Sequence, residues 1–339
     1  MNKLITFVIA ESPRLKKGEV LEQKPLQSAP QYYHSAIPKQ FASTEERKEV
    51  LGKSVKFLIR TYPSENFLIE AAVEVGDVFS EETFRLREAM IDACQKISQK
   101  RGGLLEMSEE YAIALVSGYQ GDPEQFLNRS TEIGAFLKSE KEPLDEKEIE
   151  YTLSTQIKYA QNDLVIVDWD GAVVFDTKGE IDDIVDLLQT ANLQLLRYRA
   201  LDKELDDRLR RVTKFAEVPN KGSFTWKRKK LEHAFREMIQ VRSKAIADFE
   251  AIDRDIKLIG DWYSARLYEL ASKKFKLEDW RKIVQKKLDT LGDIYTIVQE
   301  NFSISRHQLL ELIQIVLFFV LQVGWFGLII LEFFYYTRG

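Results

Sequence analysis

The sequence predicts an α+β N-terminal domain, followed by long coiled-coil-like helices and one C-terminal transmembrane helix. Two observations lead to this prediction. Up to about residue 178, runs of Val, Ile and Phe are typical of strands, whereas from residue 180 apolar residues recur every three or four positions, as on one face of a helix. Near the C-terminus no charged residue lies between Glu311 and Glu332, and this run of roughly 20 residues is long enough to cross a bilayer.

Composition limits the class of protein. The 339 residues suffice for about two domains, and the net charge of −5 argues against a nucleic-acid-binding protein. Cys94 is the only cysteine, which excludes an intrachain disulfide. His34, His233 and His307 show no metal-ligand spacing, and no glycine-rich phosphate loop is present. We therefore expect neither a metal nor a cofactor.

The N-terminal half divides into three segments. Residues 1–10 form a short apolar run that predicts a buried strand, and residues 11–50 hold four of the eight prolines, which predicts an extended connector. Residues 51–178 predict an α+β domain that ends in a β-hairpin. The elements expected in this domain are strands at 55–61, 67–75 and 111–119, and helices at 80–102 and 123–138.

Asp168 and Asp170 lie in the stretch DLVIVDWDGAVVFDT, which permits two interpretations. Its spacing resembles the first motif of haloacid-dehalogenase-type phosphatases, in which two such aspartates are the nucleophile and the general acid. No further strand pattern follows Asp176 to carry the other residues that those enzymes need. We favour a hairpin with Asp170-Gly171 as its two-residue turn and a positive φ at Gly171. A magnesium-dependent phosphohydrolase is the alternative.

Residues 180–302 predict a long helical hairpin or coiled coil. One helix is expected at 181–216 and a second at 225–270. At 1.5 Å per residue the second helix spans roughly 70 Å, which is too long for a small domain to cover. Its apolar stripe, which includes Ile252 and Ile256, is therefore expected to pack on other helices, among them those of a second copy of the chain.

A third helix at 280–298 leads to the transmembrane helix at 309–336. Within the apolar span, two amides and two glycines suit contact with a neighbouring helix. They are Gln314, Gln322, Gly324 and Gly327. An amide that faces another membrane helix forms a hydrogen bond worth about 0.6 kcal/mol, whereas one that faces lipid has no partner. The sequence thus predicts a homo-oligomer.

The one basic cluster consists of Lys227, Arg228, Lys229 and Lys230. It permits contact with anionic lipid headgroups, for which each cation near the surface contributes about 1 kcal/mol. The interpretation that we favour is a solvated first turn of the second helix.

The C-terminal third resembles the required-for-meiotic-nuclear-division family. The similar residues are Phe224-x-Trp226 with Leu231-Glu232, Trp280 through Lys287-Leu288-Asp289 to Ile297, and Leu310-Glu311 before the apolar segment. The resemblance implies a membrane-anchored, oligomeric organiser of no known enzymatic activity. Magnesium channels of the CorA type share the order of domain, long helices and membrane region, but they have two membrane helices with a Gly-Met-Asn signature, which this chain lacks.

The function that the sequence favours is therefore structural. We expect a tail-anchored, self-associating scaffold protein without catalytic activity, in contact with the lipid bilayer through one helix. Because the anchor is made last, the domain is expected to stay on the cytosolic or organelle-interior face where it was synthesised. Besides the phosphohydrolase, an ion-channel-like oligomer is the remaining alternative.

Overall fold

The computed structural model describes residues 1–12, 19–20, 41–62, 66–217 and 262–337, with short helical pieces at 233, 236–237, 239–243 and 245–247. The chain forms two compact units. The first comprises residues 1–204 and 243–285, and the second comprises residues 205–242 and 286–339. The two units are described separately.

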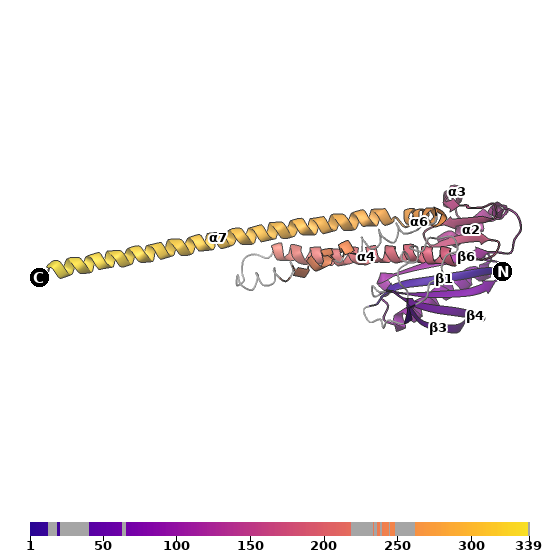
Figure 1. Ribbon diagram of the computed structural model, residues 1–339, viewed down its shortest axis with the longest axis horizontal. Helices are drawn as coiled ribbons and strands as arrows, with labels where there is room; N and C mark the ends of the chain where they lie inside the picture. Colours follow the sequence, from indigo (N-terminus) through magenta and orange to yellow (C-terminus); the bar gives the residue numbers. More distant parts are fainter. Residues whose placement is uncertain are drawn as a thin grey trace. The chain divides into compact units, whose positions relative to one another are not determined.

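The first unit is built on one mixed sheet (Figure 1). Its strand order is β2-β3-β4-β5-β1-β6-β9-β8-β7. All neighbouring strands are antiparallel except β6 and β9, which run parallel. The strands are β1 (Asn2–Glu11), β2 (Glu19–Val20), β3 (Phe41–Val50), β4 (Lys53–Thr61), β5 (Asn66–Val75), β6 (Ser108–Val116), β7 (Gln156–Ile157), β8 (Asp163–Val167) and β9 (Gly171–Asp176). The N-terminal domain therefore has an α+β fold. The sequence predicted the central strands of its sheet, which are β1, β4, β5 and β6.

Strand β3 corrects the connector that we predicted over residues 11–50. It pairs with β4 along its whole length through a two-residue turn at Leu51-Gly52, where both φ angles are positive. The pattern had indicated no strand because residues 45–49 are all charged. Charged side chains are common near the edge of a sheet, where they discourage pairing with other chains.

Helices cover one face of the sheet with apolar side chains. The helical elements after β5 are α1 (Glu81–Lys100), η2 (Leu105–Met107), η3 (Pro123–Arg129), α2 (Ser130–Lys138) and α3 (Glu146–Leu153). Alternate residues of the central strands pack with Leu86, Met90 and Cys94 of α1 and Phe136 of α2. Ser80, at the start of the helix predicted over residues 80–102, caps α1 by accepting a hydrogen bond from the Thr83 amide.

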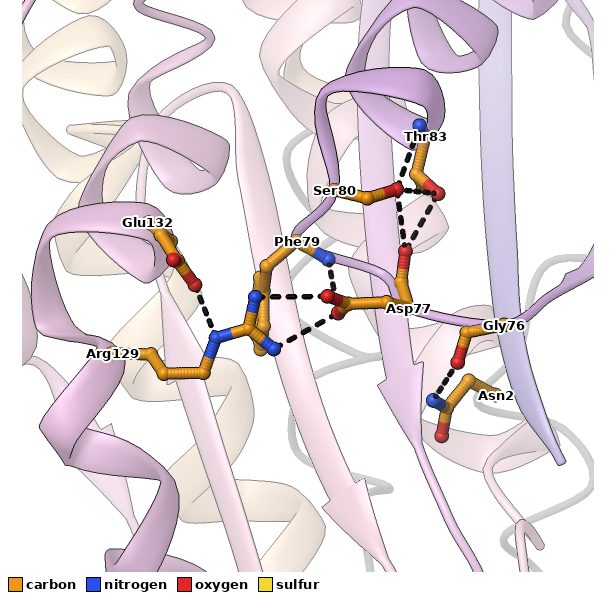
Figure 2. A network of polar contacts seen from close by, with 8 residues as sticks. All are labelled: Asn2, Gly76, Asp77, Phe79, Ser80, Thr83, Arg129 and Glu132. Atoms are coloured by element: carbon orange, nitrogen blue, oxygen red, sulfur yellow. Dashed lines mark hydrogen bonds and ion pairs between the residues drawn. The ribbon is translucent and has the colours of Figure 1, made fainter.

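The loop that leads into α1 is fixed by Asp77 (Figure 2). Its carboxylate accepts hydrogen bonds from Arg129 Nη1 and Nη2 at 3.0 and 2.9 Å and from the Phe79 amide at 3.0 Å. The pKa of Asp77 is lowered, chiefly by the hydrogen bonds from Arg129. Arg129 also contacts Glu132, so this network joins the β5–α1 loop to η3 and α2.

The other face of the sheet is covered by the first part of α4 (Asp182–Glu217), which begins where we predicted a long helix. This part is not a solvated coiled coil, because apolar and polar residues are buried on several of its faces. The buried polar residues are Gln189, Asn192 and Gln194. Gln189 donates to Glu70 of β5 at 2.8 Å, and Tyr268 of α6 (Trp262–Lys274) donates to Gln194. The helix therefore lies between strands and another helix of the same unit.

In the second unit, charged pairs link its helical segments. Lys287 binds Asp206 at 2.7 Å, and Arg208 binds Glu237 at 3.3 Å. Leu205, Leu288 and Leu291 are buried. These contacts show packed helices, whereas a regular coiled coil remains a prediction. Most of the helix predicted at 225–270 lies outside the described residues.

The helix α7 (Leu277–Thr337) is continuous where we predicted two helices, at 280–298 and 309–336 (Figure 1). No glycine or proline occurs between Gly292 and Gly324, so nothing in the sequence interrupts helical hydrogen bonding there. Its stretch Leu310–Phe333 is long and apolar enough to cross a membrane, with a mean hydropathy of 2.3 and none of it buried inside the protein.

Candidate functional site

The candidate site is the turn between β8 and β9. The hairpin is present, because Val167 pairs with Ala172 in an antiparallel register. The Asp168 amide donates to the Gly171 carbonyl at 2.9 Å, so the two turn residues are Trp169 and Asp170. The prediction of a turn at Asp170-Gly171 with a positive φ at Gly171 was therefore wrong.

Gly171 is needed for space rather than for its φ angle. A Cβ atom at this position would lie 3.0 Å from the Ala112 carbonyl oxygen and 3.5 Å from atoms of Phe136. The close approach arises because Gly171 begins β9 beside the parallel strand β6 and beneath α2. Because the dipeptide Asp-Gly is typical of turns, the sequence explained Gly171 by its backbone conformation and did not indicate its role in packing.

The Asp168 side chain is buried between two lysines. Only 4% of the residue is exposed, and its Oδ1 and Oδ2 lie 3.3 Å from Lys274 Nζ and 3.4 Å from Lys138 Nζ. Oδ1 also accepts a hydrogen bond from the Trp169 amide at 2.8 Å. A buried carboxylate stays charged only when cations or hydrogen-bond donors compensate its lost hydration. The two lysines supply that compensation.

The lysines come from the ends of two helices. Lys138 is the last residue of α2, and Lys274 is the last residue of α6. Lys138 also binds Glu148 of α3 at 2.7 Å. Burial alone would lower the pKa of Lys138, but the hydrogen bond that Lys138 donates to Glu148 and the charge of Asp168 raise it. The turn thus joins three helices, and sequence reasoning found neither lysine because both belong to ordinary helix C-termini.

Arg87 holds the backbone of the same turn. This buried α1 residue donates to the Asp170 carbonyl at 2.8 Å and to the Phe136 carbonyl, and its guanidinium lies 4.7 Å from the centre of the Phe136 ring. Burial lowers the pKa of Arg87 to about 10, so the side chain is still protonated at neutral pH.

Aromatic rings complete the site. The Tyr111 hydroxyl donates to the Asp168 carbonyl at 3.0 Å, and its ring meets the edge of Phe275 at 5.6 Å between centroids. Phe275 is fully buried and also contacts Trp169. Trp169 and Tyr151 are exposed, and Lys274 Nζ lies 4.8 Å from the centre of the Tyr151 ring.

This geometry makes Asp168 an ion-pair partner. To act as a nucleophile or to bind Mg²⁺, its carboxylate would first have to break its ion pairs with both lysines, so that the substrate or the metal ion could take their place. Asp170 is half-buried, and burial raises its pKa in spite of the nearby Arg87. Across the described ranges, no three His, Cys, Asp or Glu side chains are grouped as metal ligands. The phosphohydrolase alternative stays an untested prediction.

The residues predicted for oligomer and membrane contact fall into two groups. Gln314 and Gln322 are exposed on α7, and a Cβ atom at Gly324 or Gly327 would meet nothing within 4 Å. These four residues are therefore accessible in the second unit. The other predicted contact residues lie outside the described residues: Ile252, Ile256, Lys227, Arg228, Lys229 and Lys230.

Comparison with known proteins finds similarity to proteins that are described as uncharacterized. A family model described as "Uncharacterized protein MJ0711, N-terminal domain" matches residues 42–182, which end where α4 begins. The chain is 28% identical over 269 residues to "Uncharacterized protein MJ0711" of Methanocaldococcus jannaschii, and the alignment covers 79% of each chain. No solved structure matches. Neither description mentions meiotic nuclear division, so that resemblance stays a prediction.

Replacing Gly171 by alanine tests the packing role of this glycine. We expect Gly171→Ala to lower the free energy of unfolding by about 1–3 kcal/mol, because the new methyl group meets a backbone oxygen that cannot rotate away. Chemical denaturation of the detergent-solubilised protein measures the change. Gly76→Ala is the matched control, because a Cβ atom there has open space and the φ angle is not positive. Equal stability of the two variants would contradict this account.

Proposed function

We propose that this protein is a C-terminally membrane-anchored structural protein, in which an α+β domain is carried on a helix that spans the bilayer. The observation that supports this proposal most strongly is the apolar stretch Leu310–Phe333, none of which is buried within the protein. A contiguous apolar surface of this size is unfavourable in water, and lipid would remove it from water along its whole length.

The limits of the apolar stretch fit a bilayer. Glu311 and Glu332 stand near its two ends, and the residues between them are uncharged. An uncharged helix of about 20 residues is roughly 30 Å long, which equals the thickness of the hydrocarbon core. The carboxylates would then lie at the level of the headgroups, where charge is tolerated.

A structural role agrees with the chemistry of the domain. Among the described residues, the most deeply buried carboxylate is Asp168, and it forms ion pairs with Lys138 and Lys274. The Asp77 network likewise joins loops to helices. The resemblance to the meiotic-nuclear-division family implies the same class of protein.

Two arginines in the centre of the span test the anchor. We expect Leu317→Arg combined with Leu321→Arg to move the protein from the membrane fraction to the soluble fraction, because each arginine costs about 2.5–3.5 kcal/mol at the centre of a membrane helix. Fractionation of cell membranes followed by carbonate extraction measures this change.

The matched control for this test is Leu310→Arg, because an arginine at the end of the span can reach the headgroups with its side chain. The control should stay in the membrane fraction. Retention of the double variant in carbonate-washed membranes would contradict the proposal that Leu310–Phe333 anchors the protein.

We also propose that copies of the chain associate through the apolar stretch. Gln314, Phe318 and Gln322 follow one another in steps of four, so they lie along one side of α7. Their side chains are exposed in the single chain. A second copy supplies the same amides in return, and Gly324 and Gly327 leave room for its backbone.

Substitution of both amides tests self-association. We expect Gln314→Leu with Gln322→Leu to weaken the oligomer by a few-fold in dissociation constant, since a hydrogen bond between membrane helices contributes about 0.6 kcal/mol. Energy transfer between labelled copies in lipid vesicles measures it. The control adds Val316→Gln and Val320→Gln, which restores the number of amides on another side of the helix. If the dissociation constant of this control returned to the wild-type value, or if the wild-type protein were monomeric, the assignment of Gln314 and Gln322 to the contact between copies would be refuted.

A further inference from the structure

The segment that joins α6 to α7 is attached to the β8–β9 turn at several points. It consists of Lys274, Phe275 and Lys276, between the end of α6 and Leu277 at the start of α7. Lys274 contributes an ion pair and Phe275 contributes a buried ring to the site around Asp168. We call these three residues the α6–α7 corner.

The chain changes direction at Lys276. Its φ of +51° lies in the left-handed region, which a residue with a side chain seldom occupies without support from its surroundings. The Lys276 carbonyl accepts hydrogen bonds from the amides of Asp279 and Trp280, both at 3.0 Å, and so begins the first turn of α7. The conformation of the corner therefore sets how α7 begins.

Asp168 is the residue on which the contacts of the corner converge. Its carboxylate binds Lys274 Nζ, its carbonyl accepts from the Tyr111 hydroxyl, and Tyr111 packs against Phe275. The Lys274 side chain is only 11% exposed. If Asp168 loses its charge, a buried ammonium group is left without its carboxylate, which strongly disfavours the docked position.

We propose that Asp168 is an ionic latch that holds the α6–α7 corner, and with it the first turns of α7, against the sheet of the first unit. Opening the latch frees the corner while the sheet and α1 stay folded. Because α7 continues without a break to Thr337, the latch acts at the base of the helix that carries the apolar stretch. The latch itself consists of contacts within the first unit and holds whether or not the stretch enters a membrane.

Hydrogen exchange of the full chain in detergent micelles tests the latch. With Asp168→Asn we expect the amides of residues 271–284 to exchange about tenfold faster or more, because the corner opens locally. Amides of β1 and β5 should keep their wild-type rates. Asp170→Asn is the matched control, because it removes a carboxylate from the same turn without touching Lys274, and it should leave both sets unchanged.

Lys274→Met removes the other half of the latch and covers the case in which Asp168→Asn does not fold. It should accelerate the same amides, and the double variant should exchange no faster than the faster single variant, because both changes break one interaction. Unchanged exchange at the corner in either folded variant, or equal acceleration across β1 and β5, would overturn the proposal.

A distance measurement tests the position of α7 itself. Spin labels are attached at Lys178→Cys and Lys282→Cys, which are two exposed positions of the first unit. The native Cys94 reacts poorly with the label, because burial raises the pKa of its thiol to about 12. We expect a narrow distance distribution in the otherwise wild-type protein and with Asp170→Asn. Asp168→Asn should broaden it, and an equally narrow distribution would exclude the latch.

Discussion

An apolar helix surface that the described residues leave exposed is the constraint on which the other conclusions depend. Every described side chain in the stretch Leu310–Phe333 is exposed, although the stretch is the most apolar part of the chain. The core of the first unit is already complete, because the central strands are covered on both faces by α1, α2 and α4. We propose lipid and further copies of the same helix as the partners of this surface.

The second constraint is the cost of burying charge. The β8–β9 turn places the Asp168 carboxylate beside the ends of α2 and α6, where Lys138 and Lys274 form ion pairs with it. One carboxylate thereby joins a hairpin to helices that are far apart in the sequence. The proposed latch on the α6–α7 corner rests on this requirement, because Lys274 is one of the two lysines beside Asp168.

Sequence patterns predicted those parts of the fold in which local chemistry and packing agree. The apolar runs of β1, β4, β5 and β6, the Ser80 cap and the uncharged span of α7 each carry their own signal. The strand β3 was missed because its charged residues suit an edge of the sheet and not a core. The first part of α4 was taken for a coiled coil, since the helical period does not reveal that Gln189 and Gln194 bind partners on β5 and α6.

For a similar reason, the sequence predicted the hairpin of the candidate site but not the contacts that its residues make. The Asp-Gly dipeptide correctly indicated a hairpin, but the roles of Gly171 and Asp168 depend on a strand, two lysines and an arginine distant in the sequence. No local pattern marks Lys138, Lys274 or Arg87, because each lies on an ordinary helix. Tertiary contacts of this kind become apparent only when the helices are placed on the sheet.

The most direct test of the central claim is the accessibility of single cysteines along α7 in native membranes. Cysteine introduced at Leu317, Val320 or Leu328 should be protected from a water-soluble maleimide, whereas cysteine at the exposed Lys178 should react readily. The buried Cys94 contributes little background, because its pKa is raised to about 12. All sites should react after denaturation in detergent. Rapid labelling at the three α7 positions in intact membranes would contradict the account.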